Sequence, residues 1–321
     1  MVFTTEKQAT KAAGPQPAAG PQPADGTPAQ RKRRINLVPY GFLSPTIILI
    51  VVLMLIPIVM VIWYSLMDNV ITKKNPQFVG FSNYAEVLGS ESFHTAILNT
   101  VFFTTVSVAA HLVLGLTFAT LLNTRFLKSF TKAIFRVIYV MPWLFTVAII
   151  AILWRLLLSP NGIINFLVME LGLSSTTIEW LASPDTALLA VTFINIWAGY
   201  PFFMVSLLAG LQGIPKDLYE AARVDGANPV QQFLNITLPQ LRPIIISMAL
   251  LDLIWTSQQF ALIWMTTGGG PINSTEMLST FTYKLAFSEY NFSMAAASAV
   301  IILAFSMVLA VFYVRYQKAR D

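Results

Sequence analysis

Four residues suited to binding hydroxyl groups recur at helical spacing in one apolar segment. Asp252, Trp255, Thr256 and Gln259 stand at positions i, i+3, i+4 and i+7, so an α-helix places them on one face. Carboxylate, hydroxyl and amide groups bind the hydroxyls of a solute, and an indole ring covers the apolar face of a pyranose. The stripe therefore fits a carbohydrate better than an ion. In the alternative interpretation, Asp252 pairs with a neighbouring helix or with a partner chain.

Two further polar residues flank a tryptophan in a second apolar segment. Asn195 and Tyr200 lie on either side of Trp197, and Gly199-Tyr200-Pro201 joins a flexible residue to one that lacks a backbone N–H. We expect this tripeptide to break its helix and to turn Asn195 and Tyr200 toward the solute path, whereas Trp197 is equally suited to face lipid. For His111, a lone histidine in an apolar segment, we expect a hydrogen-bonded structural role rather than a proton relay.

The composition excludes several kinds of chemistry. The sequence has no cysteine and two histidines, which removes disulfides and thiolate metal sites and leaves too little for a histidine-based metal site. It has no nucleotide-binding loop, no residues at the spacing of a catalytic triad and no paired carboxylates in one loop. We expect a chain that is not an enzyme and has no metal and no cofactor of its own. Nucleic acid is not an expected partner, because the cations lie at helix ends.

The elements that position these residues are expected to be transmembrane helices. Of the 321 residues, 56% are hydrophobic and 11% are charged, which is too little polar surface for a water-soluble globule of this size. A helix needs roughly 20 apolar residues to cross the hydrocarbon layer of a membrane. Six segments meet this requirement: 45–67, 95–122, 133–158, 187–211, 244–265 and 293–314.

The distribution of Lys and Arg orients these six segments. With a cytoplasmic N-terminus, the even-numbered loops and both ends of the chain hold most of the cations. The opposite side holds Lys73, Lys74 and Lys284, with Arg155 near its boundary. Cytoplasmic loops carry the excess of cations in membrane proteins, so both termini are predicted to be cytoplasmic.

The first 40 residues differ in composition from the rest. They are rich in Pro, Ala, Gly and Gln, and end in a run of cations at residues 31–34. We predict that residues 1–40 form a disordered basic cytoplasmic tail and that residues 41–321 form the transmembrane domain. The first apolar segment is full-length and is expected to be retained rather than cleaved as a signal peptide.

The loop at residues 212–243 carries signals for a helix, a turn and a second helix. Pro215 suits the first turn of a helix over residues 216–224, and Gly226 can adopt the left-handed conformation that ends a helix. Asn228-Pro229 then supplies a cap and a first helical residue. We therefore predict a short helix pair on the cytoplasmic side.

The same loop resembles the signature loop of ABC importer permeases. It follows the pattern E-A-A-x3-G-x9-I-x-L-P at every position, and a spacing of this length is far more specific than a short motif. In that family the loop docks into the ATPase subunit and couples ATP hydrolysis to gating. The resemblance implies this coupling role for Glu220, Ala221, Ala222, Gly226, Ile236, Leu238 and Pro239. The alternative is an ordinary amphipathic connector on the membrane surface.

Segments on both sides of this loop are similar to the carbohydrate-uptake branch of the family, the maltose-type permeases. The similarity includes Phe78-Val-Gly-Phe-Ser-Asn-Tyr84, Thr267-Gly-Gly-Gly-Pro271 and Tyr283-x-x-Ala-Phe287. The glycine run is expected to be a flexible turn or a contact for the binding protein. The sequence departs from the branch at Ser257-Gln258-Gln259, where the family usually has an Asn and an acidic or Asn residue around a Phe. The identity of the solute is therefore left open.

The resemblance implies an all-α integral membrane protein with six transmembrane helices and the type I ABC importer permease fold. Such a permease forms half of the path for a sugar, expected to be a di- or oligosaccharide, that a solute-binding protein delivers. The implied partners are a second permease, expected to be a different chain, two ATPase subunits that bind the ATP, and membrane lipid. The implied location is the plasma (inner) membrane of a bacterium or archaeon.

Other cargoes and other classes of protein are the alternatives. Glycerol-3-phosphate or another small solute would use the same machinery, although a phosphate favours cations and none lies inside the six apolar segments. A secondary transporter would need intramembrane ionisable sites repeated in two halves, and Asp252 is the one carboxylate available. A membrane enzyme would need clustered catalytic groups near one interface, and the sequence has none.

Overall fold

The structure is a computed structural model that describes the backbone of residues 38–124 and 128–318 and the side chains of residues 41–124 and 128–316. The predicted tail, residues 1–40, lies almost entirely outside the described residues. The chain divides into two units, residues 1–51 and 52–321. In the first unit, the described residues form helix α1 (Val38–Ile50), which contains Pro45.

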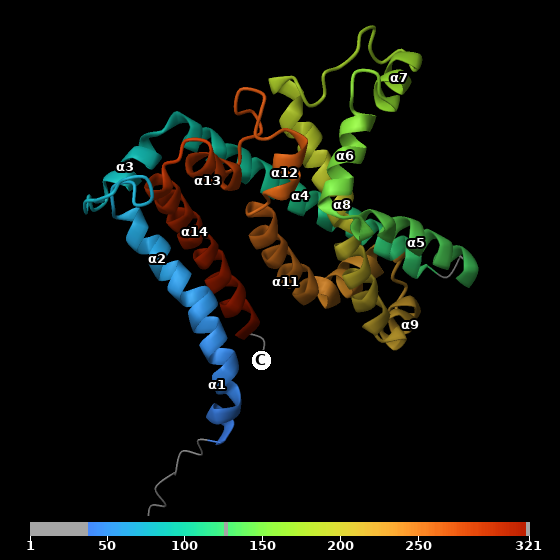
Figure 1. Cartoon of the computed structure of the whole chain (residues 1–321). Helices are drawn as coiled ribbons and strands as arrows, with labels where there is room; N and C mark the ends of the chain where they lie inside the picture. Colours follow the sequence, from blue (N-terminus) through green and yellow to red (C-terminus); the bar gives the residue numbers. More distant parts are fainter. Residues whose placement is uncertain (1–37, 125–127, 319–321) are drawn as a thin grey trace, which may run out of the picture. The chain divides into compact units, whose positions relative to one another are not determined.

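Every regular element of the described residues is a helix, as the sequence predicts (Figure 1). After α1 the chain continues through the π-helical turn η1 (Val51–Leu55). The other elements are α2 (Ile56–Ser65), α3 (Ser82–Gly89), α4 (Glu91–Asn123), α5 (Ser129–Leu144), α6 (Val147–Leu157), α7 (Ile163–Glu170), α8 (Pro184–Gly213), α9 (Lys216–Val224), α10 (Pro229–Gln232), the π-helical turn η2 (Phe233–Thr237), α11 (Leu238–Ser257), α12 (Ala261–Thr266), α13 (Leu278–Phe287) and α14 (Phe292–Lys318).

Helices α4 and α8 form the most extensive packing in the second unit. Phe203, Met204 and Leu207 of α8 are fully buried, and Leu241 of α11 joins the same apolar cluster. The two helices approach closely at Gly115, because a Cβ at this position would collide with Phe203. Glycine is therefore required for the crossing that forms the centre of the bundle.

A second apolar cluster joins α3, α4, α13 and α14. Phe93 of α4 and Phe281 of α13 pack with their ring centroids 5.6 Å apart and are buried with Ala297 of α14. The start of α3 is tied to the end of α2, because the Asn83 side-chain amide donates to the carbonyl oxygens of Ser65 (2.8 Å) and Met67 (2.9 Å). These contacts hold the C-terminal end of α2 against the bundle.

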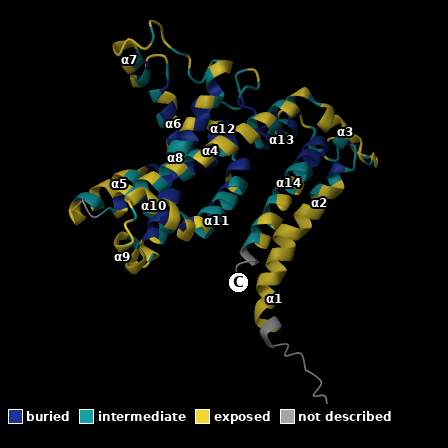
Figure 2. Ribbon diagram, turned by 180° about the vertical axis from the view of Figure 1, so that it is seen from behind, coloured by how far each residue is buried: buried dark blue, intermediate teal, exposed yellow. Residues whose placement is uncertain are grey.

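Five helices of the described residues are long and apolar enough to cross a membrane, and a sixth span arises when the bent pair α5 and α6 is taken together. The first candidate span, Gly41–Ser65, has no residue buried in its most apolar window, and exposed residues cover most of α2 (Figure 2). Surfaces of this size and apolarity require lipid or a partner chain. The chain is a multi-pass α-helical membrane protein.

The predicted third span, residues 133–158, is not one straight helix. Helix α5 ends at Leu144 and α6 begins at Val147, and their axes differ by 99°. Pro142 removes one backbone N–H from the last turn of α5. Thr146 then has an extended conformation and accepts from the Ile149 N–H at 3.4 Å, which is an N-cap that starts a new helix.

The predicted fifth span, residues 244–265, is also corrected. Helix α11 begins at Leu238 and ends at Ser257, and the candidate membrane span is Pro229–Ser257. The Gln258 and Gln259 N–H groups donate to carbonyls three residues earlier, at 3.3 and 3.2 Å, which tightens and ends the helix. Apolar composition had located the lipid-compatible segment and could not locate the helix ends.

Candidate functional site

The predicted cytoplasmic helix pair is largely confirmed as a structure. Helix α9 spans Lys216–Val224 as predicted, and Gly226 has a φ of +81°, the left-handed conformation expected of it. Asn228 caps α10 in a capping box with Gln231, with reciprocal hydrogen bonds of 2.9 Å. The second helix differs from the prediction because it does not end: α10 continues through η2 directly into α11.

The coupling residues predicted from the signature loop lie on both arms of this turn. Glu220 and Ala221 are exposed on α9, and Ile236 is half-buried in η2. One hydrogen bond ties the arms together, because the Tyr219 hydroxyl lies 2.8 Å from Thr237 Oγ1. Of the remaining signature residues, Ala222 and Leu238 are half-buried, and Gly226 and Pro239 are exposed. This hydrogen bond joins α9 to η2, which continues directly into α11.

A cavity of about 300 Å³ lies where α4, α8 and α11 meet the bend between α5 and α6. Helix α8 contributes Asn195, Ala198, Gly199 and Phe202, which stand at i, i+3, i+4 and i+7 on one face. The residues from α11 and the segment after it are Asp252, Trp255, Thr256 and Gln259. Five of the six residues predicted to line the solute path therefore border one cavity.

The polar groups of the cavity are organised around Asp252. Its Oδ2 lies 2.8 Å from His111 Nδ1, and its Oδ1 accepts from the Thr256 hydroxyl at 3.0 Å. The other ring nitrogen of His111 lies 3.1 Å from the backbone carbonyl oxygen of Asn195. The Asn195 side-chain amide nitrogen is buried and has no hydrogen-bond partner within the described residues. It is one of the few buried side-chain donors of the described residues that lack a partner.

An aromatic wall completes the cavity. The Phe202 ring lies 5.8 Å from Trp255 and 6.0 Å from Trp143, measured between centroids. Trp255 is 58% exposed and Trp143 is 54% exposed, so both present ring area to an incoming molecule. The site thus combines stacking surfaces with hydroxyl-binding groups.

Tyr200 is not among the residues that border this cavity. It is buried with its ring 5.2 Å from Phe118. Helix α8 continues through Pro201 to Gly213, so the predicted break at Gly199-Tyr200-Pro201 does not occur. In an unbroken helix Tyr200 points about 100° away from Gly199, which does border the cavity.

Sequence reasoning missed Phe202 and Trp143 and assigned His111 only a structural role. The spacing that identified the α11 stripe also connects Asn195 with Phe202 on α8, so this signal was present in the sequence. Trp143 had no such signal, because it borders the cavity only through the bend between α5 and α6. His111 does make the hydrogen bonds expected of it, and it also borders the cavity.

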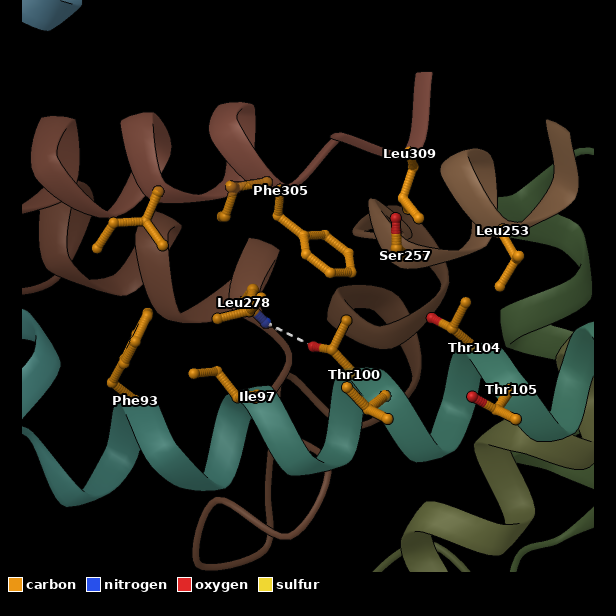
Figure 3. Close-up of a pocket in the computed structure, with 13 residues that line it drawn as sticks. Phe93, Ile97, Thr100, Thr104, Thr105, Leu253, Ser257, Leu278, Phe305 and Leu309 are labelled. Carbon is orange, nitrogen blue, oxygen red and sulfur yellow. Dashed lines mark hydrogen bonds between the residues drawn. The ribbon is translucent and has the colours of Figure 1, made fainter. Parts of the chain in front are cut away.

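A second, apolar pocket of about 220 Å³ lies between α4, α11, α13 and α14 (Figure 3). Its walls are mainly Phe, Leu, Ile and Val side chains. Thr100, one of its few polar residues, already accepts from the Leu278 N–H at 3.0 Å. This pocket offers little to a hydroxyl-rich solute.

The Gly268–Gly270 segment forms a turn with left-handed Gly268 and Gly269. Thr275 Oγ1 donates to the Gly270 carbonyl oxygen at 2.8 Å, and Glu276, which is buried, pairs with Lys284 beside Gly269. The predicted turn is confirmed. Its suggested contact with a binding protein stays a prediction.

The fold and the cavity define a polytopic membrane protein with a solute-sized polar site inside its helical bundle. The family model for the binding-protein-dependent transport system inner membrane component matches residues 111–320. The chain belongs to this family of ABC importer permeases, as its signature loop predicted.

Two relatives and one solved structure illustrate the similarity. The chain is 37% identical over 280 residues to the trehalose/maltose transport system permease protein MalF of Thermococcus litoralis, covering 87% of this chain and 92% of that one. It is 31% identical over 288 residues to the sulfoquinovosyl glycerol transport system permease protein SmoG of Agrobacterium fabrum, covering 89% and 92%. A chain of the bacterial alginate ABC transporter in complex with alginate pentasaccharide-bound periplasmic protein superposes with a TM-score of 0.75. That alignment covers 85% of this chain and 91% of the other at 24% identity, and it shows the fold.

Proposed function

We propose that this chain is the permease subunit of an ATP-driven importer and that a sugar passes through the cavity between α4, α8 and α11. The observation that carries the proposal is the cavity lining, which pairs exposed Trp255 and Trp143 rings with the polar groups of Asn195, Asp252 and Thr256. Aromatic faces and hydroxyl-binding groups at one site suit a saccharide. The names of the two relatives, which refer to trehalose, maltose and sulfoquinovosyl glycerol, support the same class of cargo.

The coupling step is assigned to the signature loop. Two ATPase subunits bind and hydrolyse the ATP, and they act on Glu220 and Ala221 of α9, which are exposed and ready for contact. The hydrogen bond between Tyr219 and Thr237 passes the movement to η2 and α11. Since α11 carries Asp252, a rigid-body shift of α9 changes access to the cavity.

The remaining parts of the proposal follow the family resemblance. A second permease, expected to be a different chain, supplies the other half of the path, and a solute-binding protein delivers the sugar outside the cell. The chain has six spans, with both termini in the cytoplasm of a bacterium or archaeon, and sits in the inner membrane. A phosphorylated cargo is disfavoured because no Lys or Arg borders the cavity within the described residues.

The first experiment identifies the partners and measures uptake. The full chain is tagged, extracted in mild detergent and analysed by mass spectrometry, and the recovered complex is reconstituted for uptake of radiolabelled trehalose and maltose. Recovery of an ATPase subunit and a second permease, with uptake that needs ATP, is expected. A chain that came out alone and still transported would remove the importer assignment in favour of a secondary transporter.

The assignment of the cavity is tested with two tryptophans matched in exposure. Trp255 is 58% exposed at the cavity and Trp63 is 56% exposed outside it. We expect Trp255→Leu to raise KM for the sugar about tenfold, the loss of one stacking contact worth about 1.4 kcal/mol, and Trp63→Leu to leave KM unchanged. Equal KM values in the two variants would show that the sugar does not contact Trp255, and the cavity would no longer be assigned as the sugar path.

The coupling assignment is tested separately with a pair of exposed glutamates. Glu220→Ala should lower uptake per ATP hydrolysed while leaving the amount of chain in the membrane unchanged. Glu86 on α3 is also exposed, and Glu86→Ala serves as the control. Normal uptake by Glu220→Ala would remove this residue from the coupling contact.

A further inference from the structure

Both ring nitrogens of the buried His111 have hydrogen-bond partners within the protein. Nε2 lies 3.1 Å from the Asn195 backbone carbonyl oxygen, and Nδ1 lies 2.8 Å from Asp252 Oδ2. His111 is 2% exposed and Asp252 is 8% exposed. The hydrogen bonds of the pair are therefore fixed by the protein rather than exchanged with solvent.

These two contacts determine how many protons the pair holds. A carbonyl oxygen only accepts hydrogen bonds, so Nε2 carries a proton and donates it. An unprotonated Nδ1 and an ionised carboxylate oxygen are both acceptors and would repel each other at 2.8 Å. A proton must lie between them, either on Nδ1 of an imidazolium facing a carboxylate or on a carboxylic acid that donates to a neutral ring. In both forms the formal charges of the pair sum to zero.

We propose that His111 and Asp252 hold this shared proton throughout transport, and that the resulting uncharged cavity selects an uncharged, hydroxyl-rich saccharide over acidic sugars. The inference rests on the proposed function, since it concerns the cargo of the same cavity. It makes His111 a positioning residue: the ring keeps Asp252 neutralised and aimed at Thr256.

The surroundings of the pair support this role. Among the described residues that border the cavity, His111 and Asp252 are the only titratable side chains. The tyrosines of the neighbouring helices α5 and α8, Tyr139 and Tyr200, pack against Phe118 instead. Gly199 leaves the space that the imidazole occupies, because a Cβ there would collide with the His111 ring.

Spectroscopy tests the proton directly and does not depend on the cargo. The chain has two histidines, and His94 is exposed, so a ¹⁵N-histidine-labelled His94→Gln chain assembled with unlabelled partner subunits leaves His111 as the single labelled histidine. We expect Nε2 to be protonated in one of two patterns. Either Nδ1 is protonated as well, or the ring is neutral and an infrared carboxylic-acid band appears that Asp252→Asn removes. An unprotonated Nε2, or a neutral ring without that band, overturns the proposal.

Uptake of radiolabelled maltose tests the consequence for transport. Asp252→Asn keeps a neutral pair, since its amide donates to Nδ1 and its oxygen still accepts from Thr256, so KM for maltose should rise less than it does in His111→Gln. His111→Gln leaves the carboxylate in the cavity without its proton donor, so KM for maltose should rise about tenfold or more. The double variant should recover the values of Asp252→Asn.

Three results would distinguish a failure of the shared-proton proposal from a failure of the proposed transport function. Impairment of Asp252→Asn equal to that of His111→Gln would show that the carboxylate charge is needed, and it would overturn the proposal. Uptake of the acidic disaccharide maltobionate at the rate of maltose would overturn the selection of uncharged cargo. A wild-type complex that transports no sugar would refute the proposed function alone, because the spectroscopic result on the pair would still stand.

Discussion

Replacing Gly115 with alanine tests the close approach of α4 and α8. A Cβ at this position would collide with Phe203 Cβ and lie 3.0 Å from the Met204 backbone nitrogen. Carbon atoms pack at about 3.5–4.0 Å, and neither partner is the end of a flexible side chain, so the helices must move apart. Overpacking of this kind costs about 1–3 kcal/mol, and the better helix propensity of alanine offsets about 0.5–1 kcal/mol.

Gly115 lies on α4, and two glycines of α8 extend this test to a graded series. At Gly210 the new Cβ would lie 2.6 Å from Ile244 Cδ1, a side-chain end that can rotate, and at Gly213 it would meet nothing within 4 Å. Thermal unfolding of the purified chain should therefore show the largest loss for Gly115→Ala, a smaller loss for Gly210→Ala and none for Gly213→Ala. A Gly115→Ala chain as stable as the Gly213→Ala chain would refute the packing argument.

Three other changes have effects that the contacts predict. Tyr219→Phe removes the hydrogen bond to Thr237, worth about 0.5–1.5 kcal/mol, and should lower the uptake per ATP in proteoliposomes without reducing the amount of complex. Gly226→Ala places a Cβ in the left-handed conformation at a cost of about 1–2 kcal/mol, and hydrogen exchange at the end of α9 should become faster. Asn165 holds the segment after α6 through four hydrogen bonds, so Asn165→Ala should expose this segment to limited proteolysis, and the exposed Asn161→Ala should not.

The loop was predicted residue by residue because its signals are local. The positive φ of Gly226 and the capping box of Asn228 depend on residues within a few positions of each other. The helix ends of the third and fifth spans could not be predicted in the same way. An apolar run such as 133–158 is compatible with lipid whether its helix is straight or bent by 99° near Thr146. Composition alone therefore cannot predict the bend.

The site shows a different limit of sequence reasoning. Helical spacing correctly grouped Asp252 with Trp255 and Thr256, and the same spacing on α8 groups Asn195 with Phe202. Spacing defines a face, but it does not say what that face meets. His111 and Asp252 are 141 positions apart, and only the packing of α4 against α11 places their side chains in contact.

The sequence left two interpretations of Asp252 open, lining of the solute path and pairing with a neighbouring helix or a partner chain. The structure shows the pairing with a neighbouring helix, through His111 of α4, and places the carboxylate at the border of a cavity. Lining of the solute path stays a proposal. An unpaired charge within a candidate membrane span would be expensive, whereas a pair that shares a proton carries no net charge. With the proposed sharing of a proton with His111, Asp252 can border the cavity without placing a net charge there.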